Sequence, residues 1–116
     1  MDGNGRWAKK RNLPRTFGHK KGSENLKNIT LVCNEIGIKA LSVYAFSTEN
    51  WKRPKLEVEF LMKMLDKYLK NELQTYHEHN IRFKAIGDLS SFSTTLQKRI
   101  KETEELTKNN TSLTQI

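Results

Sequence analysis

The sequence has one cysteine and no apolar run long enough to cross a membrane. Cys33 therefore has no partner for an internal disulfide, which fits a protein of a reducing compartment. Internal repeats and low-complexity segments are also absent. With 116 residues, 35% of them hydrophobic and 29% charged, the composition predicts one small globular domain over residues 1–116.

Acidic residues are scarce at the start of the chain. Residues 1–21 contain seven Lys and Arg residues against one acidic residue, Asp2, and so hold +6 of the net charge of +8. A basic cluster beside a glycine-rich turn favours an anionic ligand. The anion could be a diphosphate, a nucleic acid or a membrane surface, and charge alone leaves these alternatives open.

The first seven residues, MDGNGRW, combine glycines with charged groups. Gly3 and Gly5 can adopt positive φ and turn backbone N–H groups toward one point, a geometry that binds anions. Arg6 adds a planar cation that suits phosphate oxygens. Asp2 would repel a phosphate unless a cation such as Mg²⁺ lay between them. The alternative is an ordinary glycine turn with solvated charges, and a motif this short does not decide between the two.

Helical and strand patterns alternate along the chain. The predicted helices span residues 23–36, residues 55–79 and a segment that begins at the N-cap Ser93. The predicted strands span residues 38–46, 81–86 and 113–116. This alternation predicts an α/β fold with a parallel β-sheet and flanking helices. Because both chain ends look like strands that are cut short, we expect a fold truncated at both ends.

Several local features refine this prediction. Residues 8–22 are expected to be irregular, with Pro14 and Gly18 as breakers. Gly37 is expected to end the first helix. The first strand is apolar on both faces and is therefore expected to be buried. Leu106 is expected to face the core from the last helix.

Polar segments follow the expected strands, and the carboxyl ends of parallel strands are where open α/β folds bind ligands. One such segment is residues 2–7, and the other is residues 47–53. We expect these segments to meet over one site, a phosphate site with aromatic walls. Its expected members outside the glycine turn are Arg15, His19, Ser47, Asn50, Trp51 and Arg53.

Longer motifs carry a resemblance to a known family. The segments MDGNGRWA at residues 1–8, RTFGH at 15–19 and YAFSTENWKRP at 44–54 resemble the cis-prenyltransferases of the undecaprenyl diphosphate synthase type. The resemblance covers the whole chain. It implies Mg²⁺-dependent, repeated addition of isopentenyl diphosphate to farnesyl diphosphate, with cis double bonds. The implied product is undecaprenyl diphosphate, the lipid carrier for cell-wall glycans.

The resemblance also implies roles for individual residues. Asp2 would hold Mg²⁺ and act on the allylic diphosphate. Asn50, the other catalytic residue, holds the position that the family often gives to the proton acceptor. Because an amide is a poor base, we expect Asn50 to orient substrate while a diphosphate oxygen takes the proton. The implied substrate-binding residues are Gly3, Asn4, Gly5, Arg6, Trp7, Arg15, His19, Ser47, Thr48, Glu49, Trp51 and Arg53. The isopentenyl diphosphate site and a second metal ligand are expected beyond Ile116.

The resemblance further implies a homodimer at full length, in the cytoplasm, with peripheral membrane contact through the lipid product. No nucleic acid is expected as a partner. Two other functions stay open: a basic nucleic-acid-binding module, and a non-catalytic subunit that binds prenyl diphosphate. The chain has no Asp-Asp-x-x-Asp motif, so the trans-type prenyl synthases are a poor match.

One face of the long helix has two interpretations. Leu61, Met64 and Leu65 share this face, and a stripe of this kind is usually core. Together with the small Ala45 of the preceding strand, it could also line a tunnel for a growing prenyl chain. If Ala45 is ordinary core, a larger side chain there should reduce stability instead.

Overall fold

The computed structural model describes residues 2–46 and 48–116, except for the side chain of Thr48. The helices are α1 (Asn4–Lys10), α2 (Arg15–Glu35), the 3-10 helix η1 (Thr48–Lys52), α3 (Lys55–Glu78) and α4 (Thr94–Thr107). The strands are β1 (Ala40–Leu41), β2 (Arg82–Phe83) and β3 (Thr114–Gln115). Helices and strands alternate over most of the chain, so the α/β class is confirmed.

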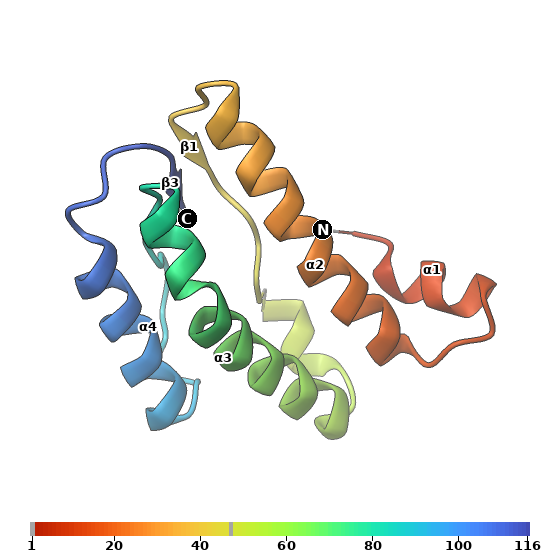
Figure 1. Ribbon diagram of the computed structural model, residues 1–116. Coiled ribbons are helices and arrows are strands. Elements are labelled where there is room, and N and C mark those ends of the chain that lie inside the picture. The colour runs from red at the N-terminus through yellow and green to blue at the C-terminus, as the bar shows by residue number, and fades with distance from the viewer. Residues whose placement is uncertain (1, 47) are drawn as a thin grey trace.

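In Figure 1, α1 lies against the N-terminal half of α2, on the side away from α3 and α4.

The sheet is parallel, as predicted, but its strands are short. Its order is β1-β3-β2, with Ala40 and Arg82 both in register with Thr114. Beyond the assigned strands, further backbone bonds join their ends, among them Val43 N–H to Ile116 O and Lys84 N–H to Gln115 O, each at 2.9 Å. The prediction of a buried strand over residues 38–46 is wrong, because Tyr44 is 91% exposed. A parallel strand is buried only where neighbouring elements cover both of its faces.

Residues 8–22 are largely helical, which corrects the expectation of an irregular segment. Pro14 is the N-cap of α2, a position that requires no backbone N–H, so it starts the helix. Gly5 lies within α1, and only Gly3 of the first two glycines has a positive φ, 88°. The expected turn with both glycines at positive φ is therefore wrong.

Glycines on α2 explain where α1 packs. A Cβ atom on Gly18 would lie 2.0 Å from the backbone oxygen of Asn4, and one on Gly22 would lie 2.3 Å from the Asn4 side-chain nitrogen. Ala8 of α1 is fully buried in the same contact region, and its Cβ would lie 3.3 Å from a Cβ atom on Gly18. The two glycines lie one helical turn apart, so they form a continuous groove on one face of α2. This groove positions the start of the chain.

The core has two clusters. One contains Leu69, Leu96 and Ile100, between α3 and α4. The other contains Tyr76, Ile81 and Leu113, beside the strands. The expected core position of Leu106 is wrong: it is 55% exposed, because the buried face of α4 continues through Thr103 and Thr107 instead.

Two predicted helix boundaries are confirmed, and the long helix lies almost where it was expected. The Ser93 side chain accepts a hydrogen bond from Leu96 N–H at 3.2 Å and so caps α4. Gly37 follows the C-cap of α2 with φ of 87°. α3 ends at Glu78, one residue before the expected end. Ala45 is exposed, so its interpretation as core is wrong; the tunnel stays a prediction.

Buried polar groups connect α3, β3 and α2. The Tyr76 hydroxyl donates to Gln115 Oε1. Gln115 Nε2 donates to Thr30 Oγ1 at 3.1 Å, and Thr30 donates to the Leu26 carbonyl at 2.8 Å. Burial raises the pKa of Tyr76, which keeps its hydroxyl protonated as the donor.

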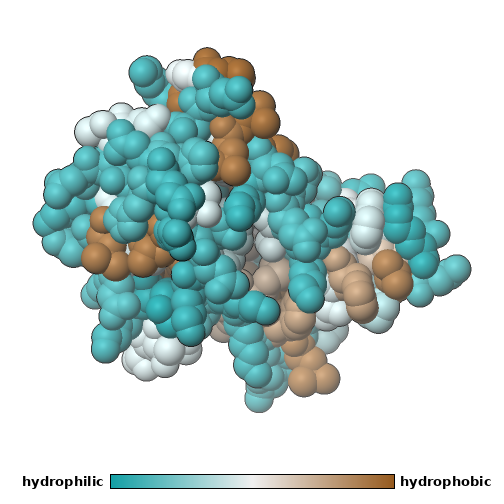
Figure 2. Space-filling view, viewed as in Figure 1, coloured by the Kyte–Doolittle hydropathy of each residue, from teal (hydrophilic) through white to brown (hydrophobic). Residues whose placement is uncertain are grey.

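Hydrophilic residues cover most of the face shown in Figure 2, with a hydrophobic area near the C-terminal end of α2. The exposed apolar residues of that region are Ile29, Val32, Ile36 and Ile38. Among the described residues, no helix combines the length and the apolarity needed to cross a membrane.

Candidate diphosphate site

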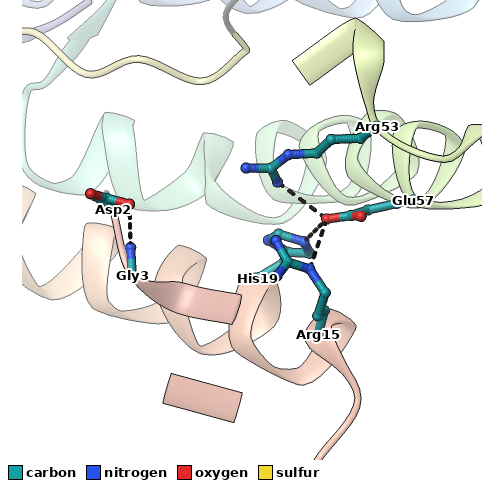
Figure 3. A network of polar contacts seen from close by, with 6 residues as sticks. All are labelled: Asp2, Gly3, Arg15, His19, Arg53 and Glu57. Atoms are coloured by element: carbon teal, nitrogen blue, oxygen red, sulfur yellow. Dashed lines mark hydrogen bonds and ion pairs between the residues drawn. The ribbon is translucent and has the colours of Figure 1, made fainter. Parts of the chain in front are cut away.

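One carboxylate oxygen lies at the centre of a basic cluster (Figure 3). Glu57 Oε1 lies 2.9 Å from His19 Nε2, 3.1 Å from Arg53 Nη1 and 3.4 Å from Arg15 Nε. The side chains of His19 and Glu57 are only 7% and 14% exposed. We call Arg15, His19, Arg53 and Glu57 the Glu57 cluster.

The four residues of the cluster form two pairs, and the members of each pair are four residues apart in the sequence. Arg15 and His19 lie four residues apart at the start of α2, so their side chains share one face. Arg53 precedes α3, and Glu57 lies in the first turn of that helix, again four residues later. The cluster therefore joins the predicted segments 15–19 and 47–53, which are far apart in the sequence.

The Glu57 carboxylate is ionised at neutral pH. Burial alone raises the pKa of Glu57, but the hydrogen bond with His19 and the charges of Arg15 and Arg53 outweigh it, so the pKa is lowered. An ionised carboxylate only accepts hydrogen bonds, so the proton of this contact is on His19 Nε2. With both guanidinium groups charged, the cluster has more positive than negative charge and suits an anion.

Helix α1 contacts this cluster through Gly5 and Arg15. A Cβ atom on Gly5 would lie 2.6 Å from Arg15 Nη1 and 2.7 Å from Arg15 Cζ. The guanidinium group therefore packs against α1 where only a glycine leaves room for it. The start of the chain therefore borders the Glu57 cluster through Gly5.

Asp2 lies apart from the Glu57 cluster in Figure 3. Its side chain is 98% exposed, with Oδ2 at 3.3 Å from Arg6 Nη2, while Oδ1 accepts the Gly3 N–H at 2.7 Å. A shallow hollow of about 350 Å³ lies beside it, between the start of the chain and α2. Residues that line this hollow include Asp2, Gly3, Asn4, Trp7 and Lys21.

Asp2 could bind Mg²⁺ only when other ligands complete the coordination shell of the ion. Among the described residues, no group of three His, Cys, Asp or Glu side chains could hold a metal ion. A single exposed carboxylate still suits Mg²⁺, which binds through one or two carboxylates when phosphate oxygens and waters complete its shell. Asp2 would therefore hold the ion together with a bound diphosphate rather than before it.

Aromatic rings gather next to the second segment. The ring centroids of Phe46 and Trp51 are 4.7 Å apart, and Phe92 lies 5.8 Å from Phe46 and 6.1 Å from Trp51. Trp51 is 40% exposed and thus presents part of its ring to solvent. An aromatic wall was expected here from Trp51, but the contribution of Phe92 was not.

Comparisons with known proteins identify the family of the chain. A family model described as "Putative undecaprenyl diphosphate synthase" matches residues 1–116. The chain belongs to the undecaprenyl diphosphate synthase family. The recognition from the sequence motifs is therefore confirmed.

Relatives in this synthase family align with the whole chain. It is 58% identical to an isoprenyl transferase of Helicobacter hepaticus over all 116 residues, which cover 49% of that relative. It is 57% identical to an isoprenyl transferase of Helicobacter pylori strain 26695, again over the whole chain and 50% of the relative. The chain thus spans about half the length of the curated relatives it matches.

Solved structures of the synthase fold are also similar. A crystal structure of lavandulyl diphosphate synthase from Lavandula x intermedia, in complex with dimethylallyl diphosphate, matches the whole chain and 50% of that protein. Its TM-score is 0.95 and its identity is 35%. A structure described as a probable undecaprenyl diphosphate synthase from Campylobacter jejuni matches 82% of this chain and 46% of its own, with a TM-score of 0.75 and 40% identity.

The structure brings together only part of the site expected for a synthase of this family. Arg15, His19 and Arg53 converge, whereas Arg6 pairs with Asp2. The Trp7 ring lies 4.3 Å from the Arg11 guanidinium carbon, in a cation–π contact. In η1, Asn50 is half-buried and Glu49 is exposed. The predictions for Ser47 and for the side chain of Thr48 lie outside the described residues.

Reasoning from the sequence missed Glu57, although a signal was present. Glu57 follows Arg53 by four residues and lies in the first turn of the long helix, where a carboxylate is favoured. Such pairs are common on solvated helix faces, so the signal was weak. Its role depends on His19, which lies 38 residues away in the sequence.

Proposed function

We propose that this chain forms the allylic diphosphate site of a cis-prenyltransferase. The enzyme would add isopentenyl diphosphate to an allylic diphosphate such as farnesyl diphosphate. The observation that carries this proposal is the convergence of Arg15, His19 and Arg53 beside Gly5. The relatives named isoprenyl transferase support it, and so does the dimethylallyl diphosphate in the solved relative.

The chemistry explains why cations are needed. The allylic C–O bond breaks, a new C–C bond forms to isopentenyl diphosphate, and a proton leaves the new prenyl unit as diphosphate departs. Negative charge therefore develops on the leaving group, and Arg15, Arg53 and His19 would stabilise it. Mg²⁺, held by Asp2, would add further stabilisation of the same charge. Asn50 would orient the substrate, and a diphosphate oxygen would take the proton.

The finer features of this function follow from the family resemblance and are also proposals. The product would be undecaprenyl diphosphate, the carrier for cell-wall glycans. The full-length enzyme would be a cytoplasmic homodimer that contacts the membrane peripherally through its lipid product. The resemblance assigns the isopentenyl diphosphate site and a second metal contact to a later segment of the family.

The test is calorimetric titration of the 116-residue chain with farnesyl diphosphate and Mg²⁺. Arg15→Ala and Arg53→Ala should each weaken binding about tenfold to a hundredfold, the usual loss for one charge-assisted hydrogen bond. Arg82→Ala is the matched control, because Arg82 is an exposed arginine of β2 that lies outside the Glu57 cluster. No binding to the wild-type chain, or equal losses in all three variants, would contradict the proposal.

A further inference from the structure

All three basic side chains of the Glu57 cluster contact the same carboxylate oxygen. Oε1 of Glu57 takes the contacts from Arg15, His19 and Arg53, at 3.4, 2.9 and 3.1 Å. The carboxylate is the more deeply placed group, since it is 14% exposed whereas Arg15 and Arg53 are 55% and 37% exposed. An anion that arrives from solvent therefore meets the arginines before it meets Glu57.

The contacts to Glu57 use a small part of each arginine. A guanidinium group has five N–H donors in a planar fork. Arg15 contacts Glu57 through Nε, and Arg53 contacts it through Nη1. The other N–H groups of each guanidinium are not used in these contacts. Glu57 can thus hold both groups by their inner edges while the outer edges receive an anion.

We propose that Glu57 is a positioning residue that arranges Arg15 and Arg53 for the diphosphate without contacting it. This inference rests on the proposed function of the same site. Arginine side chains lose much rotamer freedom when a ligand immobilises them, which weakens binding. A carboxylate that holds both arginines before the ligand arrives removes part of that loss. It also joins the two segments, α2 and the entry of α3, that the diphosphate must bridge.

The opposite role would be competition, with Glu57 occupying the cations until diphosphate displaces it. In that case, removing the carboxylate charge would tighten binding. The depth of Glu57 and the single oxygen it uses argue for positioning, because a displaced carboxylate would need a solvated place to move to. The sign of the affinity change therefore separates the two roles.

The experiment compares Glu57→Gln with Glu59→Gln in the 116-residue chain. Glu59 is exposed on the same helix and its replacement changes the net charge equally. We expect Glu57→Gln to weaken farnesyl diphosphate and inorganic pyrophosphate about tenfold by calorimetry, the lower end for a charge-assisted hydrogen bond. Glu59→Gln should change these affinities by less than about twofold, as expected for an exposed charge.

Two further readouts distinguish positioning from a merely structural role. In the Arg53→Ala background, Glu57→Gln should cost less affinity than in the wild type, because coupled residues are not additive. The Arg15 Nε–H signal in NMR spectra should exchange faster with water in Glu57→Gln than in Glu59→Gln. Full additivity together with an unchanged Arg15 signal would overturn the inference.

The remaining outcomes also decide the question. If Glu57→Gln does not fold, Glu57→Asp replaces it; the shorter carboxylate should still weaken binding at least about threefold, because it reaches fewer donors. Wild-type binding with unchanged or tighter affinity in the folded Glu57 variant would overturn positioning and leave the proposed function intact. Absence of farnesyl diphosphate and pyrophosphate binding to the wild type would overturn both.

Discussion

Exposure separates the roles of individual charged residues in this chain. The Asp2 side chain is 98% exposed and its ion pair with Arg6 is equally open to water, so it adds almost nothing to stability. Asp2→Ala should therefore abolish the dependence of farnesyl diphosphate binding on Mg²⁺ and leave the melting temperature unchanged. Titration with and without EDTA measures the first, and calorimetric unfolding the second. Glu59→Ala is the control; Mg²⁺ dependence retained in Asp2→Ala would exclude Asp2 as the metal ligand.

The half-buried carboxylate of Glu57 makes the opposite prediction, since its removal should affect stability in a pH-dependent way. Its pKa in the folded chain lies below the ordinary value of 4.5. A lowered pKa contributes stability that is present above the unfolded value and is lost as the pH falls through the folded one. Urea unfolding should therefore show a steeper loss of stability below about pH 4.5 in the wild type than in Glu57→Gln. Parallel curves for the two proteins would contradict an ion-paired Glu57.

At the scale of elements, the contact of α1 with α2 depends on a missing side chain. A Cβ atom on Gly18 would lie 2.0 Å from the Asn4 backbone oxygen, a distance that neither helix can accommodate without moving. Gly18→Ala should cost about 1–3 kcal/mol in the free energy of unfolding, despite the better helix propensity of alanine. Asn28→Ala, at an exposed position of the same helix, should cost nearly nothing. A stabilised Gly18→Ala variant would show that α1 does not pack here.

The connection between α3 and the sheet makes a second prediction at this scale. Tyr76→Phe removes the hydroxyl donor to Gln115, whose side chain lies buried in β3. Loss of one hydrogen bond in this buried network should cost about 1 kcal/mol or more, which should appear in urea unfolding. Tyr44→Phe is the matched control, because Tyr44 is 91% exposed and should lose almost nothing. Equal stabilities of the two variants would place the Tyr76 hydroxyl outside the network that holds the sheet.

For the whole molecule, the concentration of charge in residues 1–21 allows a prediction about partners. These residues hold +6 of the net charge of +8, which would suit either diphosphate or nucleic acid. Because Arg15 is oriented by Glu57 and Gly5, we expect specific binding of farnesyl diphosphate and only salt-sensitive, weak binding of an oligonucleotide. Competition at two salt concentrations checks this. Oligonucleotide binding that farnesyl diphosphate cannot displace would favour the nucleic-acid alternative.

A further prediction at this scale concerns turnover. The chain spans about half the length of its relatives, and the resemblance assigns isopentenyl diphosphate binding to later residues. The 116-residue chain should therefore bind farnesyl diphosphate without extending it. Incubation with Mg²⁺, farnesyl diphosphate and radiolabelled isopentenyl diphosphate, followed by thin-layer chromatography, measures extension. Labelled products of any length would show that these residues hold both substrates.

The amino-acid sequence by itself determined the features that neighbouring residues encode. The long helix α3, the Ser93 cap and the turn at Gly37 follow from spacing within a few residues; the cap and the turn are confirmed, and α3 ends one residue before its expected end. The long motifs at the two ends of the site were enough to identify the family, because several residue types recur there in a fixed order.

Only the tertiary structure decided which parts of the chain meet. Gly18 inside α2 looked like a breaker, but the close approach of α1 requires it, and packing outweighs its low helix propensity. Leu106 has helical spacing yet is exposed, because the face of α4 that meets the core is set by α3 and β2. Glu57 and His19 are 38 residues apart, and only the folding of α2 against α3 makes one carboxylate oxygen the centre of the site.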